Sequence, residues 1–181
     1  MPPEVSVIIP NYDRHGEMER AVDSVLSQEG VELELLVVDD ASGSPPLSLY
    51  ERLEELGHRV LRGRSRRGPG LCRNRAAEVA QGEYLALLDS DDYWLPGKLS
   101  RQLASLRSSG LRIGQVEEIW IRKGVRVNPL KVHRMEAGDL FERSLRAVCV
   151  SPSSVLLERS LFLELGGFDE ELFVCEDYDL W

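Results

Sequence analysis

The chain has 181 residues, of which 43% are hydrophobic and 29% charged, a composition typical of a globular protein with room for one well-packed core. Its net charge is −9, which argues against the broadly basic face of a nucleic-acid-binding protein, so no nucleic-acid partner is expected. The three cysteines are widely spaced and form no CxxC pair, so we expect neither a disulfide framework nor a zinc site, and a reducing compartment is favoured.

The amino-terminal segment predicts no leader sequence. Met1-Pro2-Pro3-Glu4 is not a basic segment followed by an apolar core, as a signal peptide would be. No apolar run approaches the roughly 18 residues of a membrane span. The cytoplasm is therefore the expected location, with peripheral attachment to the inner face of a membrane left open.

The first 110 residues alternate strand and helix patterns. Such βαβ alternation predicts a parallel sheet with right-handed crossovers. The strand patterns lie at 5–9, where Pro10 is expected to stop the strand, and at 33–38, 59–61 and 84–88. The helix patterns lie at 18–26, 47–56 and 71–80, and one further helix is expected with Pro96 at its first position.

The pattern changes after Gly110. Residues 115–127 alternate loosely before a turn at Asn128-Pro129, which predicts an antiparallel excursion or a long loop. A helix at 138–145, a strand at 153–157 and a helix at 160–165 are expected to follow. We therefore divide one domain into a ligand-binding half, 1–110, and a smaller mixed portion, 111–181. The last residues read as the start of a helix, which is typical of a fragment.

Three carboxylates in four residues, Asp89-Ser90-Asp91-Asp92, follow the apolar run at 84–88. They cannot stay in the interior, so the strand should end here, at the edge of the sheet where open α/β proteins bind ligands. Acids this close repel one another unless a cation or donor groups hold them, and hard divalent ions prefer such oxygen ligands. The alternative is a polar loop that caps the next helix.

Two earlier strands end in polar residues as well, at 10–13 and at 39–42. Because parallel strands end at one edge, these segments should lie near the acids at 89–92. A basic stretch, with five arginines from Arg59 to Arg67 and then Arg73, suits a small anion such as a diphosphate. A solvated charged loop is the alternative for this stretch.

Six segments, taken in order, resemble the sequence blocks of family-2 glycosyltransferases, whose members have the GT-A nucleotide-sugar-binding fold. The segments are Val5–Arg14, Leu36–Ser42, Gly68–Asn74, Gly82–Asp92, Gly166–Glu170 and Glu176–Trp181. One departure is Cys72, which stands where the family's Ala-Arg-Asn block has alanine. The resemblance implies an α/β fold with a Rossmann-like, mostly parallel sheet flanked by helices, and a smaller mixed region on the acceptor side.

The resemblance also implies an inverting, metal-dependent transfer of a sugar from a nucleotide-diphosphate donor to a saccharide or a lipid-linked acceptor. UDP is the favoured nucleotide, although GDP and dTDP remain open, and the cation is Mn²⁺ or Mg²⁺. The residues matched to the nucleotide sugar are Pro10, Tyr12, Asp39, Arg73, Asp89 and Ser90. Asp91, with Asp89, is matched to the metal; Asp177 is matched to the general base and Glu176 to a supporting role beside it.

Each assignment has a structural alternative. Asp39 or Asp40 could cap a helix, Tyr12 could pack in the interior, and Arg73 could pair with the acids of the second strand. Asp92 could cap the helix at Pro96, and the acids of residues 176–179 could simply favour the start of a helix.

Two other functions compete. A sugar-phosphate nucleotidyltransferase would carry a glycine-rich basic loop after the first strand, where this chain has Pro10-Asn11-Tyr12-Asp13-Arg14. A nucleotide-sugar-binding fragment without turnover is the other alternative, because the chain ends at the expected base.

Overall fold

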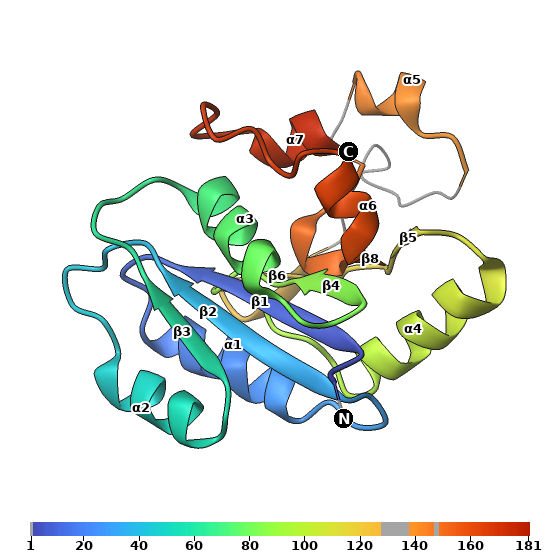
Figure 1. The fold of residues 1–181 in the computed structure, drawn as a ribbon. Helices are drawn as coiled ribbons and strands as arrows, with labels where there is room; N and C mark the ends of the chain where they lie inside the picture. The colour runs from blue at the N-terminus through green and yellow to red at the C-terminus, as the bar shows by residue number, and fades with distance from the viewer. Residues whose placement is uncertain (1, 128–137, 147–148) are drawn as a thin grey trace.

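The computed structural model describes residues 2–127, 138–146 and 149–181. Its centre is a six-stranded sheet with the order β3-β2-β1-β4-β8-β5 (Figure 1). The parallel strands are β1 (Val5–Asn11), β2 (Leu33–Asp39), β3 (Arg59–Arg62) and β4 (Tyr84–Leu87). On the other side of β4 lie β8 (Val155–Glu158), antiparallel to it, and then β5 (Ile113–Gln115), antiparallel to β8. The predicted fold class is confirmed.

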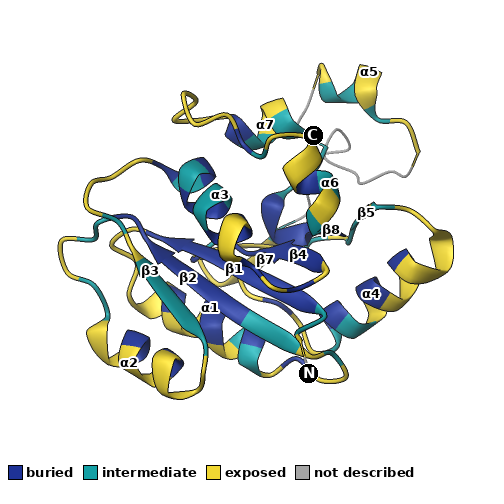
Figure 2. Ribbon diagram, viewed as in Figure 1, coloured by how far each residue is buried: buried dark blue, intermediate teal, exposed yellow. Residues whose placement is uncertain are grey.

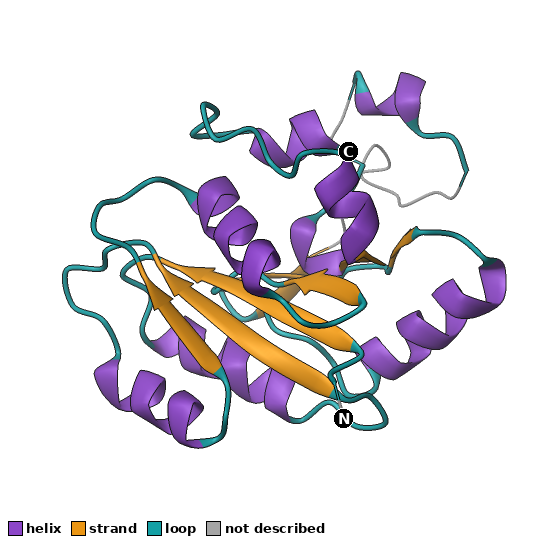
Figure 3. Cartoon of the chain, in the orientation of Figure 1, coloured by secondary structure: helices purple, strands orange, loops and turns teal. Residues whose placement is uncertain are grey.

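Helices cover both faces of the sheet (Figures 1 and 3). On one face lie α1 (Gly16–Leu26), α2 (Leu47–Glu55) and α4 (Lys98–Ser109), packed on side chains such as Val7 and Ile9. On the other face lie α3 (Pro69–Val79) and α6 (Arg159–Glu164), packed around Ile8. Because both faces are covered, the central strands are apolar at nearly every position, and they are buried throughout (Figure 2).

Two predicted boundaries at prolines are wrong. The first strand does not stop at Pro10 but continues to Asn11. Strand β4 ends at Leu87, and the last hydrogen bond beyond it joins Leu88 N–H to the carbonyl of Ile8. Pro10, which has no N–H to donate, therefore lies beyond the end of β4 and leaves no hydrogen bond of the sheet unmade on that side. Helix α4 begins at Lys98 instead of Pro96, after Gly97, whose φ of 71° lies outside the helical region.

The later part of the chain adds small elements. The hairpin of β6 (Trp120–Arg122) and β7 (Val125–Val127) confirms the predicted antiparallel excursion, whereas the turn at Asn128-Pro129 lies outside the described residues. Helix α5 covers only Phe141–Ser144, a 3₁₀ turn at Pro152–Ser154 precedes β8, and α7 covers Glu176–Leu180. Among the residues described, no helix has both the length and the apolar character that a membrane crossing requires.

Candidate active site

The carboxyl ends of β1, β2 and β4 lie side by side at one edge of the sheet, as predicted. Asn11 is in register with Asp39, and Asp40 N–H donates to the carbonyl of Asn11. The acids that follow β4 begin at Asp89, one residue beyond the Leu88–Ile8 hydrogen bond. The polar segments at 10–13, 39–42 and 89–92 therefore border one surface.

Asp39 is buried, with 3% of its surface exposed, and its carboxylate is held by two donors. Ser42 N–H donates to Oδ1 at 2.7 Å, and the Tyr50 hydroxyl donates to Oδ2 at 2.7 Å. Burial and the bond to Asp39 raise the pKa of Tyr50, so the phenol keeps the proton it donates. Asp39 does not cap a helix, because the helix that follows starts only at Leu47.

Asp40 shapes the loop that leads into α3. Its carboxylate accepts hydrogen bonds from the backbone N–H groups of Arg67, at 2.8 and 3.1 Å, and Gly68, at 2.8 Å. Backbone donors aimed at a buried carboxylate fix the path of this arginine-rich loop. Asp40 is thus a loop anchor, and its expected alternative role as a helix cap is wrong.

The acids after β4 form a turn, in which Asp92 N–H donates to the carbonyl of Asp89 at 3.0 Å. Ser153 closes this turn: its hydroxyl accepts from Asp89 N–H at 3.1 Å and donates to Asp92 Oδ2 at 2.6 Å. Partial desolvation raises the pKa of Asp92, as do the charges of Asp89 and Asp91, although the hydrogen bond from Ser153 lowers it. Asp92 therefore binds Ser153 and does not cap α4, which has no side-chain cap among the described residues.

Asp91 points to solvent, with its side chain 50% exposed. Arg14, from the loop after β1, places Nη1 3.2 Å from Asp91 Oδ2, and Arg20 donates to the Asp91 carbonyl at 3.2 Å. Both Arg14 and Asp91 are half-exposed, so this ion pair is weak and its carboxylate remains open to a competing cation.

Arg73 lies beneath these acids and is 3% exposed. Its Nη2 bonds Asp89 Oδ1 at 2.5 Å, and its Nη1 bonds Glu176 Oε1 at 2.8 Å. The predicted alternative, pairing with the acids of the second strand, is wrong, since the partners come from β4 and from α7. Through this one side chain, the segment at the end of the described chain reaches the acid cluster.

The expected base lies one residue beyond that contact. Asp177 is half-buried in the first turn of α7, and its Oδ1 accepts from Tyr178 N–H at 3.0 Å. The Tyr178 hydroxyl donates to the carbonyl of Ser144, which ties α7 to α5. Glu176 is buried and Asp177 is not, so the two neighbouring acids are in different environments.

Tyr12 lies on the surface, 37% exposed, so the alternative of interior packing is wrong. The Arg66 guanidinium lies 4.1 Å from the centre of the Tyr12 ring and 5.3 Å from that of Phe173. The two rings and the cation connect the first loop of the edge with the segment before α7. Pro10 and Ser90 are buried beside these loops.

The donor set suits a hard cation only in part. Among the residues described, no group of three His, Cys, Asp or Glu side chains could hold a metal. Asp91 and Asp89 offer carboxylate oxygens, and no hydrogen bond from a described residue reaches Asp89 Oδ2. Two carboxylates with open coordination positions suit Mg²⁺ or Mn²⁺ when phosphate oxygens and water complete the shell. The residues therefore fit a cation that arrives with a diphosphate.

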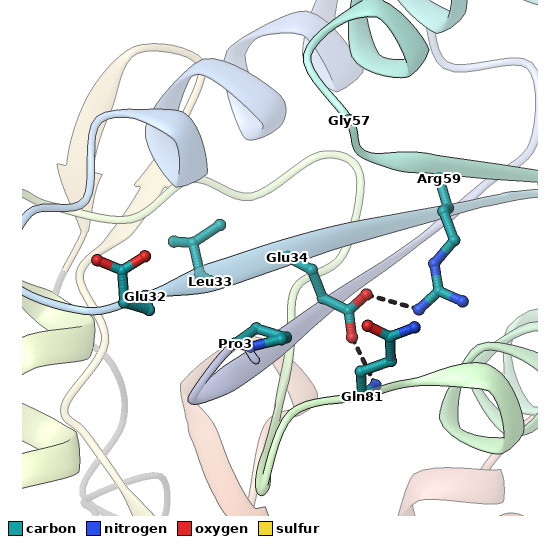
Figure 4. Close-up of a pocket in the computed structure, with 7 residues that line it drawn as sticks. All are labelled: Pro3, Glu32, Leu33, Glu34, Gly57, Arg59 and Gln81. Atoms are coloured by element: carbon teal, nitrogen blue, oxygen red, sulfur yellow. Dashed lines mark hydrogen bonds and ion pairs between the residues drawn. The ribbon is translucent and has the colours of Figure 1, made fainter. Parts of the chain in front are cut away.

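The opposite edge of the sheet has a polar pocket of about 290 Å³ (Figure 4). Its lining residues are Pro3, Glu32, Leu33, Glu34, Gly57, Arg59 and Gln81. Glu34 is already bonded there to Arg59 at 2.5 Å and to Gln81 N–H at 2.6 Å. A second pocket, of about 500 Å³, lies between the first turns of α1 and α2. Neither of these two pockets is lined by the acids at 89–92.

Sequence reasoning missed several contributors to the site, among them Tyr50, Ser153 and Arg14. Ser153 is one of many serines, and nothing in its local pattern marks it as a partner of Asp89 and Asp92. Arg14 stands within the first block that resembles the family, so its position did carry a signal.

Comparisons with known proteins identify the family and the fold. The family model described as glycosyl transferase family 2 matches residues 6–165. A UDP-Glc:alpha-D-GlcNAc-diphosphoundecaprenol beta-1,3-glucosyltransferase of Escherichia coli, WfgD, is 29% identical over 98% of this chain and 68% of its own length. The chain spans 61%, 41% and 32% of the lengths of three other curated relatives.

Two solved structures share the fold. TarS 1-349 of S. aureus, in complex with UDP, superposes with a TM-score of 0.81 at 25% identity, covering 98% of this chain and 53% of its own. The mannosyltransferase PcManGT of Pyrobaculum calidifontis, in complex with GDP-Man and Mn²⁺, gives a TM-score of 0.72 at 21% identity, covering 99% and 51%.

Proposed function

This chain belongs to glycosyl transferase family 2, and we propose that it transfers a sugar from a nucleoside-diphosphate donor, UDP-sugar in the first instance, to a saccharide or lipid-linked acceptor with inversion. The observation that carries the proposal is the meeting of three groups at one sheet edge. Asp39 is fixed at the end of β2, Asp89 and Asp91 follow β4, and α7 is held to Asp89 through Arg73.

On the donor side, Asp39 reads the base. Both of its oxygens are oriented by Ser42 and Tyr50, and each keeps a further lone pair for a base N–H. Pro10 and Tyr12 border the same edge, and the exposed Tyr12 ring is positioned to cover a base. Arg66 lies on that ring and carries a positive charge toward the place of the diphosphate. Asp89 and Ser90 complete the contacts to the ribose and the phosphates.

Asp91, with Asp89, would hold Mn²⁺ or Mg²⁺. When bound, the cation supplies charge neutralisation to the departing nucleoside diphosphate. Asp91 fits this role because its only described ion pair, with Arg14, is exposed and weak. Arg73 is less suited to direct phosphate contact, since both of its terminal nitrogens are bonded within the chain.

On the acceptor side, Asp177 removes the proton of the attacking hydroxyl, a role that a positioned carboxylate can perform. Glu176 is buried against Arg73 and orients the first turn of α7. The acceptor class follows from WfgD, whose name specifies a sugar on diphosphoundecaprenol. A sugar-phosphate nucleotidyltransferase is disfavoured, because the loop after β1 contains no glycine before Gly16.

The experiment that tests the proposal measures UDP release from UDP-glucose with GlcNAc-diphosphoundecaprenol as the first acceptor. Asp177→Asn should reduce the rate about 100-fold or more, the scale of general-base catalysis, while UDP binding stays near normal. Asp179→Asn, a conservative change on the same short helix, is the matched control and should retain the rate.

Two outcomes would count against this assignment. An equal loss of UDP binding and of rate in Asp177→Asn would indicate a structural role for Asp177. UDP binding by the unaltered chain without release in any acceptor panel would support a binding fragment instead of an enzyme.

A further inference from the structure

The first turns of α3 form a seat for residues 167–176. Asn74 donates through Nδ2 to the carbonyl of Phe168 at 2.9 Å, and its Oδ1 accepts from Phe168 N–H at 2.9 Å. Gly70 allows the close approach, since a Cβ there would lie 3.0 Å from Glu176 Cγ and 3.2 Å from Phe168 Cβ. The segment before α7 is therefore packed directly on the helix that carries Arg73.

Arg73 is the charged centre of this contact. Its guanidinium binds Asp89 on one side and Glu176 on the other, and it lies 5.1 Å from the centre of the Phe168 ring. Arg73 and Glu176 are 3% and 8% exposed, whereas Asp89 is 35% exposed. The buried guanidinium of Arg73 thus compensates the charge of the buried Glu176 and also that of Asp89, which is partly exposed at the carboxyl edge of the sheet.

This geometry makes the two carboxylates interdependent. A buried charge that loses its partner is costly, so removal of either acid leaves Arg73 dependent on the other. Arg73 also occupies only Oδ1 of Asp89, so Oδ2 is the oxygen available at the open edge. The planar guanidinium fixes the angle between its two partners, which a lysine ammonium cannot do.

We propose that Arg73 is a positioning residue that couples the donor-side carboxylate Asp89 to α7, through Glu176. It orients Asp89 Oδ2 toward the open edge and holds Glu176, so the position of Asp177 depends on the state of Asp89. The naming of donor and acceptor sides rests on the proposed function. The coupling itself rests on the contacts of Arg73.

The first test follows amide hydrogen exchange in α7 with and without Mn²⁺ and UDP. In the unaltered chain, saturation with Mn²⁺ and UDP should slow exchange in residues 176–181 about threefold or more. In Arg73→Met at saturation, exchange should still slow near residues 89–92 but not in α7. Arg73→Lys should fall between the two, because lysine can hold one carboxylate at a time.

Arg159→Met is the matched control. Arg159 also bonds α3, through the carbonyls of Ala77 and Glu78 at the far end of that helix, and it touches neither acid. This variant should retain the effect of Mn²⁺ and UDP on α7. Loss of the effect in both arginine variants would show general loosening of α3, and its persistence in Arg73→Met would overturn the proposal.

The second test needs no ligand, and it separates the coupling from the proposed function. Asp89→Asn, Glu176→Gln and the double variant are compared by Tm. The double variant should lose several degrees more than the sum of the single variants, because the buried charge of Arg73 then has no carboxylate to compensate it. In an Arg73→Met background the same changes should be additive. Additive losses with Arg73 present would overturn the coupling, whereas failure of the unaltered chain to bind Mn²⁺ and UDP would overturn only the proposed function.

Discussion

Both edges of the sheet carry acids, but the acids at the two edges differ in how many hydrogen bonds the chain donates to them. At the amino edge, Glu34 accepts hydrogen bonds from Ser6 Oγ at 2.6 Å, Gln81 N–H at 2.6 Å and Arg59 at 2.5 Å, and its side chain is 14% exposed. At the carboxyl edge, the carboxylate of Asp91 is paired with the half-exposed Arg14 at 3.2 Å. Both acids border loops of the same sheet, so the difference lies in how much of their bonding capacity the chain itself uses.

That difference separates an acid whose oxygens are used by the fold from an acid that is largely exposed to solvent. Burial alone would raise the pKa of Glu34, but its hydrogen bonds from Ser6, Gln81 and Arg59 outweigh burial and lower it. The charged form of Glu34 is therefore part of the fold. Asp91 contributes little to the fold and keeps its oxygens open, which is what a cation requires. The polar pocket beside Glu34, shown in Figure 4, is accordingly a less suitable ligand site than the surface beside Asp91.

The largest expected effect is at the amino edge. Glu34→Ala should lower the free energy of unfolding by about 3 kcal/mol, because it leaves the Ser6, Arg59 and Gln81 donors without their acceptor. Since the pKa of Glu34 is lowered in the folded state, its contribution is present above the unfolded pKa and is lost as the pH falls through the folded value. Chemical denaturation at pH 7 and in the acid range measures both effects. The control Glu32→Ala, at an exposed neighbouring position, should change the free energy of unfolding little. Equal losses of stability in the two variants would contradict a special structural role for Glu34.

Lys98 contrasts with Glu34, because it is a buried charged group without a hydrogen bond to the described residues. Its Nζ has no hydrogen-bond partner among the described residues and lies 3.9 Å from the centre of the Trp94 ring, and burial lowers its pKa to about 7. An unfolded lysine keeps its proton up to about pH 10, so between pH 7 and 10 the unfolded state binds more protons and stability should rise with pH.

Lys98→Met should therefore stabilise the chain by about 2 kcal/mol at pH 7 and abolish that rise, with Trp94 offsetting part of the burial cost. Urea denaturation of both proteins from pH 6 to 10 measures the stabilisation and its pH dependence. Lys123→Met, at an exposed turn, is the control. A destabilised Lys98→Met with an unchanged pH profile would show that the ammonium is well accommodated.

The smallest effect concerns Arg14. Its exposed ion pair with Asp91 is worth at most about 1 kcal/mol, and it competes with any cation at that carboxylate. Arg14→Ala should tighten the binding of Mn²⁺ in the presence of UDP about threefold, measured by calorimetry. Arg52→Ala removes a similarly exposed pair, with Asp23, and should leave Mn²⁺ affinity unchanged. Weaker binding in Arg14→Ala would mean that Arg14 supports the cation instead of competing with it.

Local patterns predicted the parts of this molecule that depend on local chemistry. Apolar runs that end in polar residues predicted β1, β2 and β4, and parallel topology then placed 10–13, 39–42 and 89–92 at one edge. The partner of an individual side chain is not a local property. Arg73 and Glu176 are 103 positions apart, and only the packing of residues 167–176 on α3 brings them together.

The wrong boundaries have specific structural causes that the secondary-structure propensities of single residues do not include. Pro10 is tolerated inside β1 because β4 has already ended beside it. Pro96 suits a first helical position, yet the positive φ of Gly97 delays α4 to Lys98. Asp92 resembles a helix cap in sequence, but its carboxylate accepts a hydrogen bond from the hydroxyl of Ser153 instead.

The proposed binding of a cation by Asp91, together with a nucleoside diphosphate, is tested most directly by calorimetric titration of UDP into the unaltered chain and into Asp91→Ala, each with and without Mn²⁺. We expect Mn²⁺ to strengthen UDP binding to the unaltered chain. Asp91→Ala should lose this gain, and its unfolding free energy should be unchanged. Equal UDP affinity in all four titrations would contradict the proposed binding.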